Sequence, residues 1–111
     1  MVASKTELFN EVFQEQSNLF KALAHPARLQ ILHFIAKTKT CISGDISEEL
    51  PLSRTTVNQH LKELKAAGLV RGQVEGAKTN YCLDYRKIEE MKKLIFEFAG
   101  QFHGAENANC E

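Results

Sequence analysis

The sequence lacks an excess of either charge, a long apolar run and an even set of cysteines. Its 14 Lys or Arg residues balance 14 Asp or Glu residues, which argues against a histone-like coat on nucleic acid and against a membrane-surface protein held by bulk charge. No apolar run approaches the roughly 18 residues of a membrane span, and residues 1–6 are polar. We therefore expect a cytoplasmic protein with no membrane partner. The 3 cysteines lie far apart and do not predict a disulfide framework.

The length of 111 residues fits one domain. We expect residues 1–103 to form it and residues 104–111, which carry no core residues, to be a flexible tail. A chain this short buries only about two-thirds of its unfolded surface, so stabilisation by a partner subunit is expected.

The hydrophobic pattern of the first half predicts helices. Pro26 is preceded by a break at His25, because the residue before proline avoids the helical region. The predicted elements, in chain order, are a helical face over 6–20 with a polar gap at 14–18, a helical stretch over 21–24, a central helix from Pro26 through Ile35, a short strand at Cys41 and Ile42, and a short helix from a Ser43 cap to Leu50.

The second half predicts a capped helix, a hairpin and a last helix. Ser53 caps a helix over 54–67 and Gly68 ends it. Two strands over 69–75 and 79–83 flank a turn with glycine, and Asp84 caps a helix that reaches about 100–103. Two short helices, a tight turn and a hairpin make a winged helix-turn-helix, a mainly α fold with a small β-hairpin and helical dimerisation elements at both ends.

The charge is unevenly distributed along the chain. Residues 51–83 carry five basic and two acidic groups, an excess of +3, whereas residues 1–50 carry −1 and residues 84–111 carry −2. A recognition helix needs one apolar face for anchoring and one polar face for base edges and phosphates. The predicted DNA-binding residues are Ser53, Arg54, Thr55, Thr56, Asn58, Gln59, His60 and Lys62 on the helix, with Arg71 and Lys78 on the hairpin for phosphate contact.

With these motifs the chain resembles the ArsR/SmtB-type winged-helix repressors of prokaryotes. The resemblance covers roughly residues 18–100 and is carried by the segments 19–32, 52–64, 67–70 and 81–84. It implies a homodimer that binds an inverted-repeat operator in double-stranded DNA and represses transcription until an inducer lowers its affinity. It leaves the inducer open: a metal, a metalloid or a thiol-reactive species.

The last helix also predicts a dimer from its own pattern. Ile88, Met91, Ile95, Phe98 and Phe102 are spaced 3, 4, 3 and 4, which is a heptad seam. About half of this face is expected to pack on the core of its own domain. The residues predicted for the dimer interface are Phe9, Phe13, Met91, Ile95, Phe98 and Phe102. Two-fold symmetry would place two recognition helices one DNA turn apart, roughly 34 Å.

The resemblance implies three places for a sensor. The first uses two cysteines separated by one residue, and this sequence has only one of them, Cys41. At the second, on the last helix, the aligned positions hold no set of zinc ligands. At the third, a thiol pair is replaced by His33 and His103, which could hold a metal but form no disulfide, and which otherwise are ordinary helix and surface residues.

The cysteines themselves leave two interpretations. Cys41 lies near a predicted helix start, an environment that favours the reactive thiolate, and Cys110 in the tail could reach it. All three cysteines could equally be unspecialised small residues. We therefore predict no required cofactor and no confident metal site.

An enzyme would need a nucleophile, a base and a pocket. Cys41 or Cys82 with His60 could be nominated, but no motif spacing, phosphate loop or carboxylate pair supports them. We predict no enzymatic activity. Two alternatives stay open: a winged-helix module used for protein–protein contact, which the local +3 disfavours, and a constitutive regulator without a small-molecule sensor.

Overall fold

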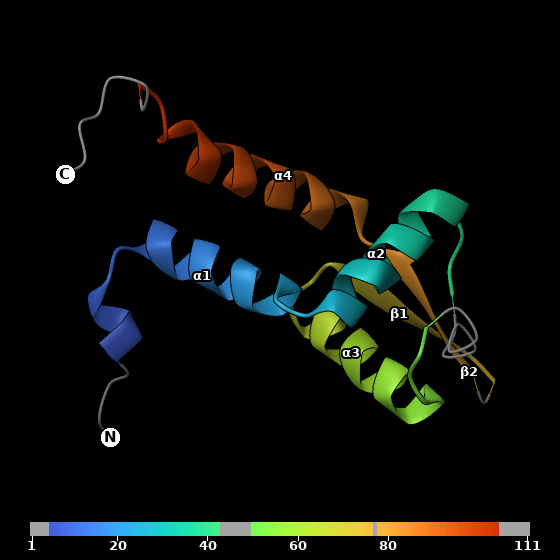
Figure 1. Cartoon of the computed structure of the whole chain (residues 1–111). Coiled ribbons are helices and arrows are strands. Elements are labelled where there is room, and N and C mark those ends of the chain that lie inside the picture. Colours follow the sequence, from blue (N-terminus) through green and yellow to red (C-terminus); the bar gives the residue numbers. More distant parts are fainter. Residues whose placement is uncertain (1–4, 43–49, 77, 105–111) are drawn as a thin grey trace.

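The computed structural model describes residues 5–42, 50–76 and 78–104. It confirms a mainly helical fold with one small hairpin (Figure 1). In chain order the elements are η1 (Lys5–Leu8), α1 (Glu11–Leu23), α2 (Pro26–Thr38), α3 (Arg54–Ala66), β1 (Val70–Glu75), β2 (Lys78–Leu83) and α4 (Tyr85–Gly100). The short helix predicted over residues 43–50 and the tail beyond Gly104 lie outside the described residues, except for Leu50.

The first two helices are separated by side-chain caps. The helix predicted over 6–20 is wrong at its start: Asn10 accepts a hydrogen bond from the backbone N–H of Val12 at 2.8 Å and begins α1 there. α1 then continues through the polar gap to Leu23. The predicted break at His25 is confirmed, because its extended backbone and its Nδ1, which accepts from the Ala27 N–H at 3.0 Å, cap α2.

The third helix and the hairpin follow the sequence signals closely. Ser53 Oγ accepts from the Thr56 N–H at 3.2 Å and caps α3. Gly68 adopts a φ of 83°, a left-handed conformation that glycine takes without a Cβ clash, and turns the chain into β1. Gly76, with a φ of 61°, turns β1 into the antiparallel β2. Asp84 caps α4, also as predicted.

The core lies between α2, α3 and the hairpin. Ile31 of α2 and Val57, Leu61 and Leu64 of α3 are fully buried, which confirms the predicted anchoring face of α3. They belong to a cluster that also contains Leu19, Ile35, Ile42, Leu50, Leu69, Val70, Tyr81 and Leu83. The predicted strand at residues 41–42 is a single bridge in which Ile42 pairs with Tyr81.

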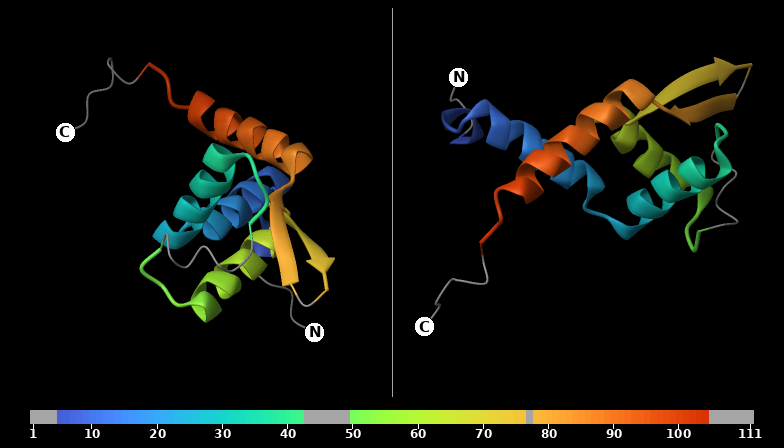
Figure 2. Two further views of the ribbon diagram at one scale, coloured as in Figure 1. Left: turned by 90° about the vertical axis from the view of Figure 1, so that its right-hand side faces the viewer. Right: turned by 90° about the horizontal axis from the view of Figure 1, so that it is seen from above.

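The α1 and α4 helices extend away from this core and lie against each other (Figure 2). Phe20 of α1 and Phe98 of α4 meet edge to face with ring centroids 4.9 Å apart. The radius of gyration is 17.2 Å, whereas a compact domain of this length has about 13 Å. No residue of α4 is buried, although the helix is strongly amphipathic. Within the described ranges, no helix is long and apolar enough to cross a membrane.

Candidate nucleic-acid interface

The α3 helix is anchored on one side and presents polar side chains on the other. Val57, Leu61 and Leu64 fix its inner face in the core. Of the predicted DNA-binding residues on the outer face, those exposed are Ser53, Arg54, Thr55, Gln59 and Lys62, and those half-buried are Thr56 and Asn58. The structure therefore gathers donors and acceptors of several kinds on one solvent-facing surface, as base-edge and phosphate contacts require.

The N-terminus of α3 is ordered by its own hydroxyl groups. Ser53 Oγ lies 3.0 Å from Thr56 Oγ1 and also accepts the Thr56 backbone N–H. Ser53 therefore caps the helix as predicted, and the Thr56 hydroxyl forms a hydrogen bond with the capping hydroxyl. A capped helix N-terminus carries a partial positive charge, and this favours phosphate groups.

The hairpin lies beside α3 and adds positive charge (Figure 1). Arg71 is exposed on β1, where it is paired with Cys82 of β2. Lys78 begins β2 and pairs with Glu75 next to the turn. Lys65, near the end of α3, also lies against the hairpin, because its ammonium would be 3.1 Å from a Cβ at Gly72.

His60 is not on the polar face, which corrects its prediction as a DNA neighbour. The residue is only 7% exposed, and its Nδ1 accepts a hydrogen bond from Arg28 Nε at 3.2 Å. Burial, followed by the nearby charges of His25 and Arg28, lowers the pKa of His60 below 6.5, and Glu63 opposes this shift. The neutral imidazole is therefore part of the support beneath α3.

Arg28 joins three helices and was also missed by the sequence analysis. Besides its bond to His60, its Nη1 lies 3.2 Å from the Ala22 carbonyl oxygen and 3.4 Å from that of Lys21, at the end of α1. The His25 and His60 rings lie 4.2 Å apart between centroids. An arginine in the first turn of a helix gives no sequence signal of such a contact, because its partner His60 is 32 residues away.

The predicted dimer residues form an apolar surface that the single chain does not cover. Phe9, Phe13 and Phe102 are 63%, 58% and 68% exposed, and Ile95 and Phe98 are each 37% exposed. Met91 is partly buried and packs against the core. The expectation that part of this face packs on its own domain agrees with the contacts of Ile88, Met91 and Leu94 with the core.

The predicted sensor residues are arranged differently from the expectation. Cys41 forms a disulfide with Cys82, with 4.3 Å between the Cα atoms. The three separated cysteines did not predict this disulfide, and it gives Cys41 a partner other than the expected Cys110, which lies outside the described residues. The disulfide follows from the antiparallel pairing of Ile42 with Tyr81, because this pairing places Cys41, which precedes Ile42, opposite Cys82, which follows Tyr81.

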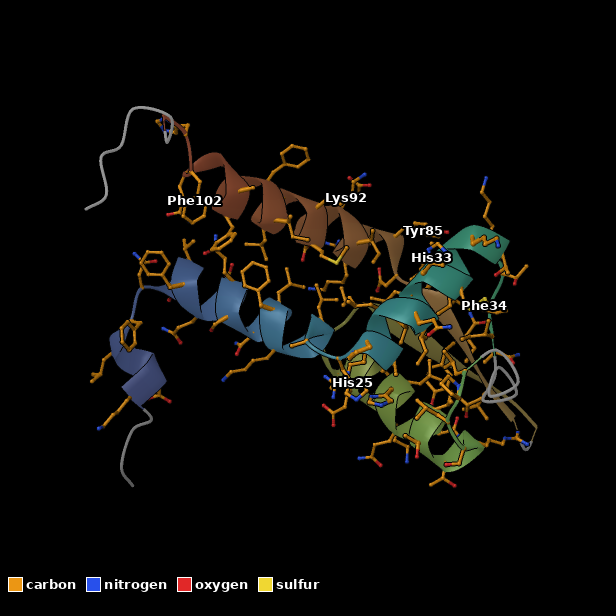
Figure 3. All side chains as sticks on the ribbon, viewed as in Figure 1. His25, His33, Phe34, Tyr85, Lys92 and Phe102 are labelled. Carbon is orange, nitrogen blue, oxygen red and sulfur yellow. A yellow bond between two sulfur atoms is a disulfide. The ribbon has the colours of Figure 1, made fainter. Side chains whose placement is uncertain are left out.

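The two histidines of the predicted sensor are not brought together within the chain. His33 is exposed on α2, while His103 follows Phe102 beyond the far end of α4 (Figure 3). Among the described residues, no group of three or more His, Cys, Asp or Glu side chains could hold a metal ion.

One face of α3 is anchored in the core, its other face is polar, and a hairpin with basic residues follows it. This arrangement defines a winged helix-turn-helix DNA-binding protein. A family model described as a helix-turn-helix domain matches residues 23–73. The transcriptional repressor PagR of Bacillus anthracis is 32% identical over 82 residues, which cover 74% of this chain and 82% of PagR. The chain belongs to the ArsR/SmtB family of transcriptional regulators, a family of DNA-binding proteins and not of enzymes.

Two further comparisons agree with this assignment. The transcriptional activator HlyU of Vibrio cholerae is 34% identical over 77 residues, which cover 69% of this chain and 70% of HlyU. The structure of an ArsR-like transcriptional regulator from Rhodococcus superposes with a TM-score of 0.67 at 25% identity, over 83% of this chain and 85% of that one.

Proposed function

We propose that this regulator works as a homodimeric repressor that binds an inverted-repeat operator in the cytoplasm and leaves it when an inducer binds. The observation that carries the proposal is α4, an amphipathic helix of 16 residues that buries none of them in the single chain. A second copy that covers α4 and the exposed phenylalanines of α1 would remove this surface from water.

The two-fold arrangement also gives the operator its form. One α3 helix reads one half-site, so a symmetric dimer presents two α3 helices to an inverted repeat with half-sites about 34 Å apart. In this proposal Arg54, Thr55, Asn58, Gln59 and Lys62 contact DNA from α3, and Ser53 and Thr56 order its N-terminus. Arg71 and Lys78 contact phosphate from the hairpin.

Repression and release are supported by separate features. PagR is named a repressor, whereas HlyU is named an activator, so the direction of regulation must be measured. A cavity of about 360 Å³ lies between α1, the end of α3 and α4, bordered by Glu15, Leu19, Lys87, Glu90 and Leu94 among others. Its volume is within the range of small-molecule sites, and its ligand class is open.

The test is selection of the operator from random DNA, followed by sedimentation and binding measurements on the full chain. We expect a dimer that binds the selected inverted repeat, with affinity that falls steeply with salt by a log–log slope of roughly −0.9 per phosphate contact. A promoter assay with that operator then gives the direction of regulation. A monomer, or binding without preference for an inverted repeat, would overturn the proposal.

A further inference from the structure

The Cys41–Cys82 disulfide connects the chain ahead of α3 to the hairpin. Ile42 and Tyr81 exchange two backbone hydrogen bonds, of 2.8 and 2.6 Å. In an antiparallel ladder the next residues face each other without backbone hydrogen bonds, at about 4.5 Å between Cα atoms. Cys41 and Cys82 occupy these positions at 4.3 Å. The backbone pairing therefore brings the two cysteines close enough for their sulfur atoms to bond.

The two sulfur-bearing residues differ in their access to solvent. Cys41 is exposed, whereas Cys82 is only 8% exposed. A dissolved thiolate attacks the sulfur that it can reach, and the other sulfur leaves as a thiolate. Because Cys41 is the exposed residue of the pair, we expect a thiol to attack the Cys41 sulfur and the Cys82 sulfur to be the leaving group.

The bond joins two parts of the chain that lie next to residues proposed to contact DNA. Cys82 is paired across the hairpin with Arg71, a residue proposed to contact phosphate. Cys41 precedes the segment that leads to the Ser53 cap of α3. The disulfide therefore gives the hairpin and the chain entering α3 a common covalent anchor, and fewer conformations remain to be ordered when both contact DNA.

We propose that Cys41 and Cys82 form a reversible thiol–disulfide switch in which the disulfide is the state of high DNA affinity. A low-molecular-weight thiol attacks Cys41 Sγ, forms a mixed disulfide and releases Cys82 as a thiolate, which takes a proton from water. A second thiol then attacks the mixed disulfide and frees Cys41. In total two thiols are oxidised to one disulfide, and the protein disulfide gains two electrons and two protons to give two thiols.

The proposal rests on the proposed function in one respect, because it requires binding to an operator. The experiment measures the affinity of the full chain for its selected operator and for random DNA, after oxidation and after treatment with excess dithiothreitol. Alkylation followed by mass spectrometry counts the thiols in each sample. We expect reduction to expose the thiols of Cys41 and Cys82 and to weaken operator binding by about fivefold or more.

Variants separate the switch from other effects of reductant. Cys41→Ser, at an exposed position, should bind with the affinity of the reduced protein under both conditions. Cys110→Ser is the matched control and should keep the full response. Equal affinity before and after a confirmed loss of the disulfide, or a response retained by Cys41→Ser, would overturn the switch. Failure of the oxidised protein to prefer the operator over random DNA would instead overturn the proposed function.

Discussion

Reduction of the Cys41–Cys82 disulfide should destabilise the folded chain by an amount that follows from its position. The bond closes a loop with a sequence separation of 41 residues. In the chain-entropy model a loop of this length restricts the unfolded state by about 13 cal/mol/K, which is about 4 kcal/mol at room temperature. A chain of this size has an unfolding entropy of about 0.23 kcal/mol/K, so the expected fall in Tm is about 17 °C.

Urea unfolding of the oxidised and reduced protein measures this difference without a substitution. The protomer concentration must be the same in both samples, because dimerisation adds to the apparent stability. Cys110→Ser controls for the third thiol and should show the same difference. A change below about 1 kcal/mol, with the thiols confirmed by alkylation, would show that the loop is already restricted in the unfolded state and would refute the reasoning.

Three further experiments test the remaining parts of the molecule. Asn58→Ala or Gln59→Ala should cost about 1–3 kcal/mol on the selected operator and less on random DNA, measured by anisotropy, and equal losses would contradict base contact. Phe13→Asp should give a monomer in sedimentation, while Leu29→Asp, at an equally exposed position of α2, should stay a dimer; a dimeric Phe13→Asp would remove α1 from the interface. His60→Gln should reduce the loss of stability on acidification, since glutamine accepts from Arg28 without titrating.

The sign of that pH effect follows from the lowered pKa of His60. Below about 6.5 the unfolded histidine binds a proton that the folded one still resists, so the unfolded state gains protons first. The stabilising contribution is therefore complete above this pH and is lost as the pH falls through the pKa of the folded state. Urea unfolding between about pH 7.5 and about pH 5 measures it, and identical profiles for wild type and His60→Gln would refute the assignment.

The sequence predicted the elements whose cause is local. The break at His25, the caps at Ser53 and Asp84, the glycine at the end of α3 and the hairpin turn all depend on neighbouring residues, and the structure confirms them. The predicted start of α1 was wrong. The apolar residues at positions 8 and 9 fit a helical pattern, but the Asn10 side chain caps the helix, which therefore begins after Asn10.

Contacts between distant residues could not be predicted in the same way. His60 occupies a polar position in the sequence pattern of α3, yet Arg28 supplies a hydrogen-bond donor that lets the ring be buried. Cys41 and Cys82 look unrelated until the pairing of Ile42 with Tyr81 is known. In both cases the missing information was which elements are neighbours in space.

Arg28 connects α1, which carries exposed phenylalanines, with α3, the helix proposed to contact DNA. Its guanidinium donates hydrogen bonds to carbonyl oxygens at the end of α1 and to the imidazole of His60 in α3, so it bridges the junction between these two helices. In the proposed dimer, α1 and α4 carry the contact between the copies and α3 reads the half-sites. The spacing of the two α3 helices then depends on the angle between α1 and α3. A small rotation at this junction is amplified by the distance to the two-fold axis, so the fit to a fixed half-site spacing is most sensitive to the junction that Arg28 and His60 occupy.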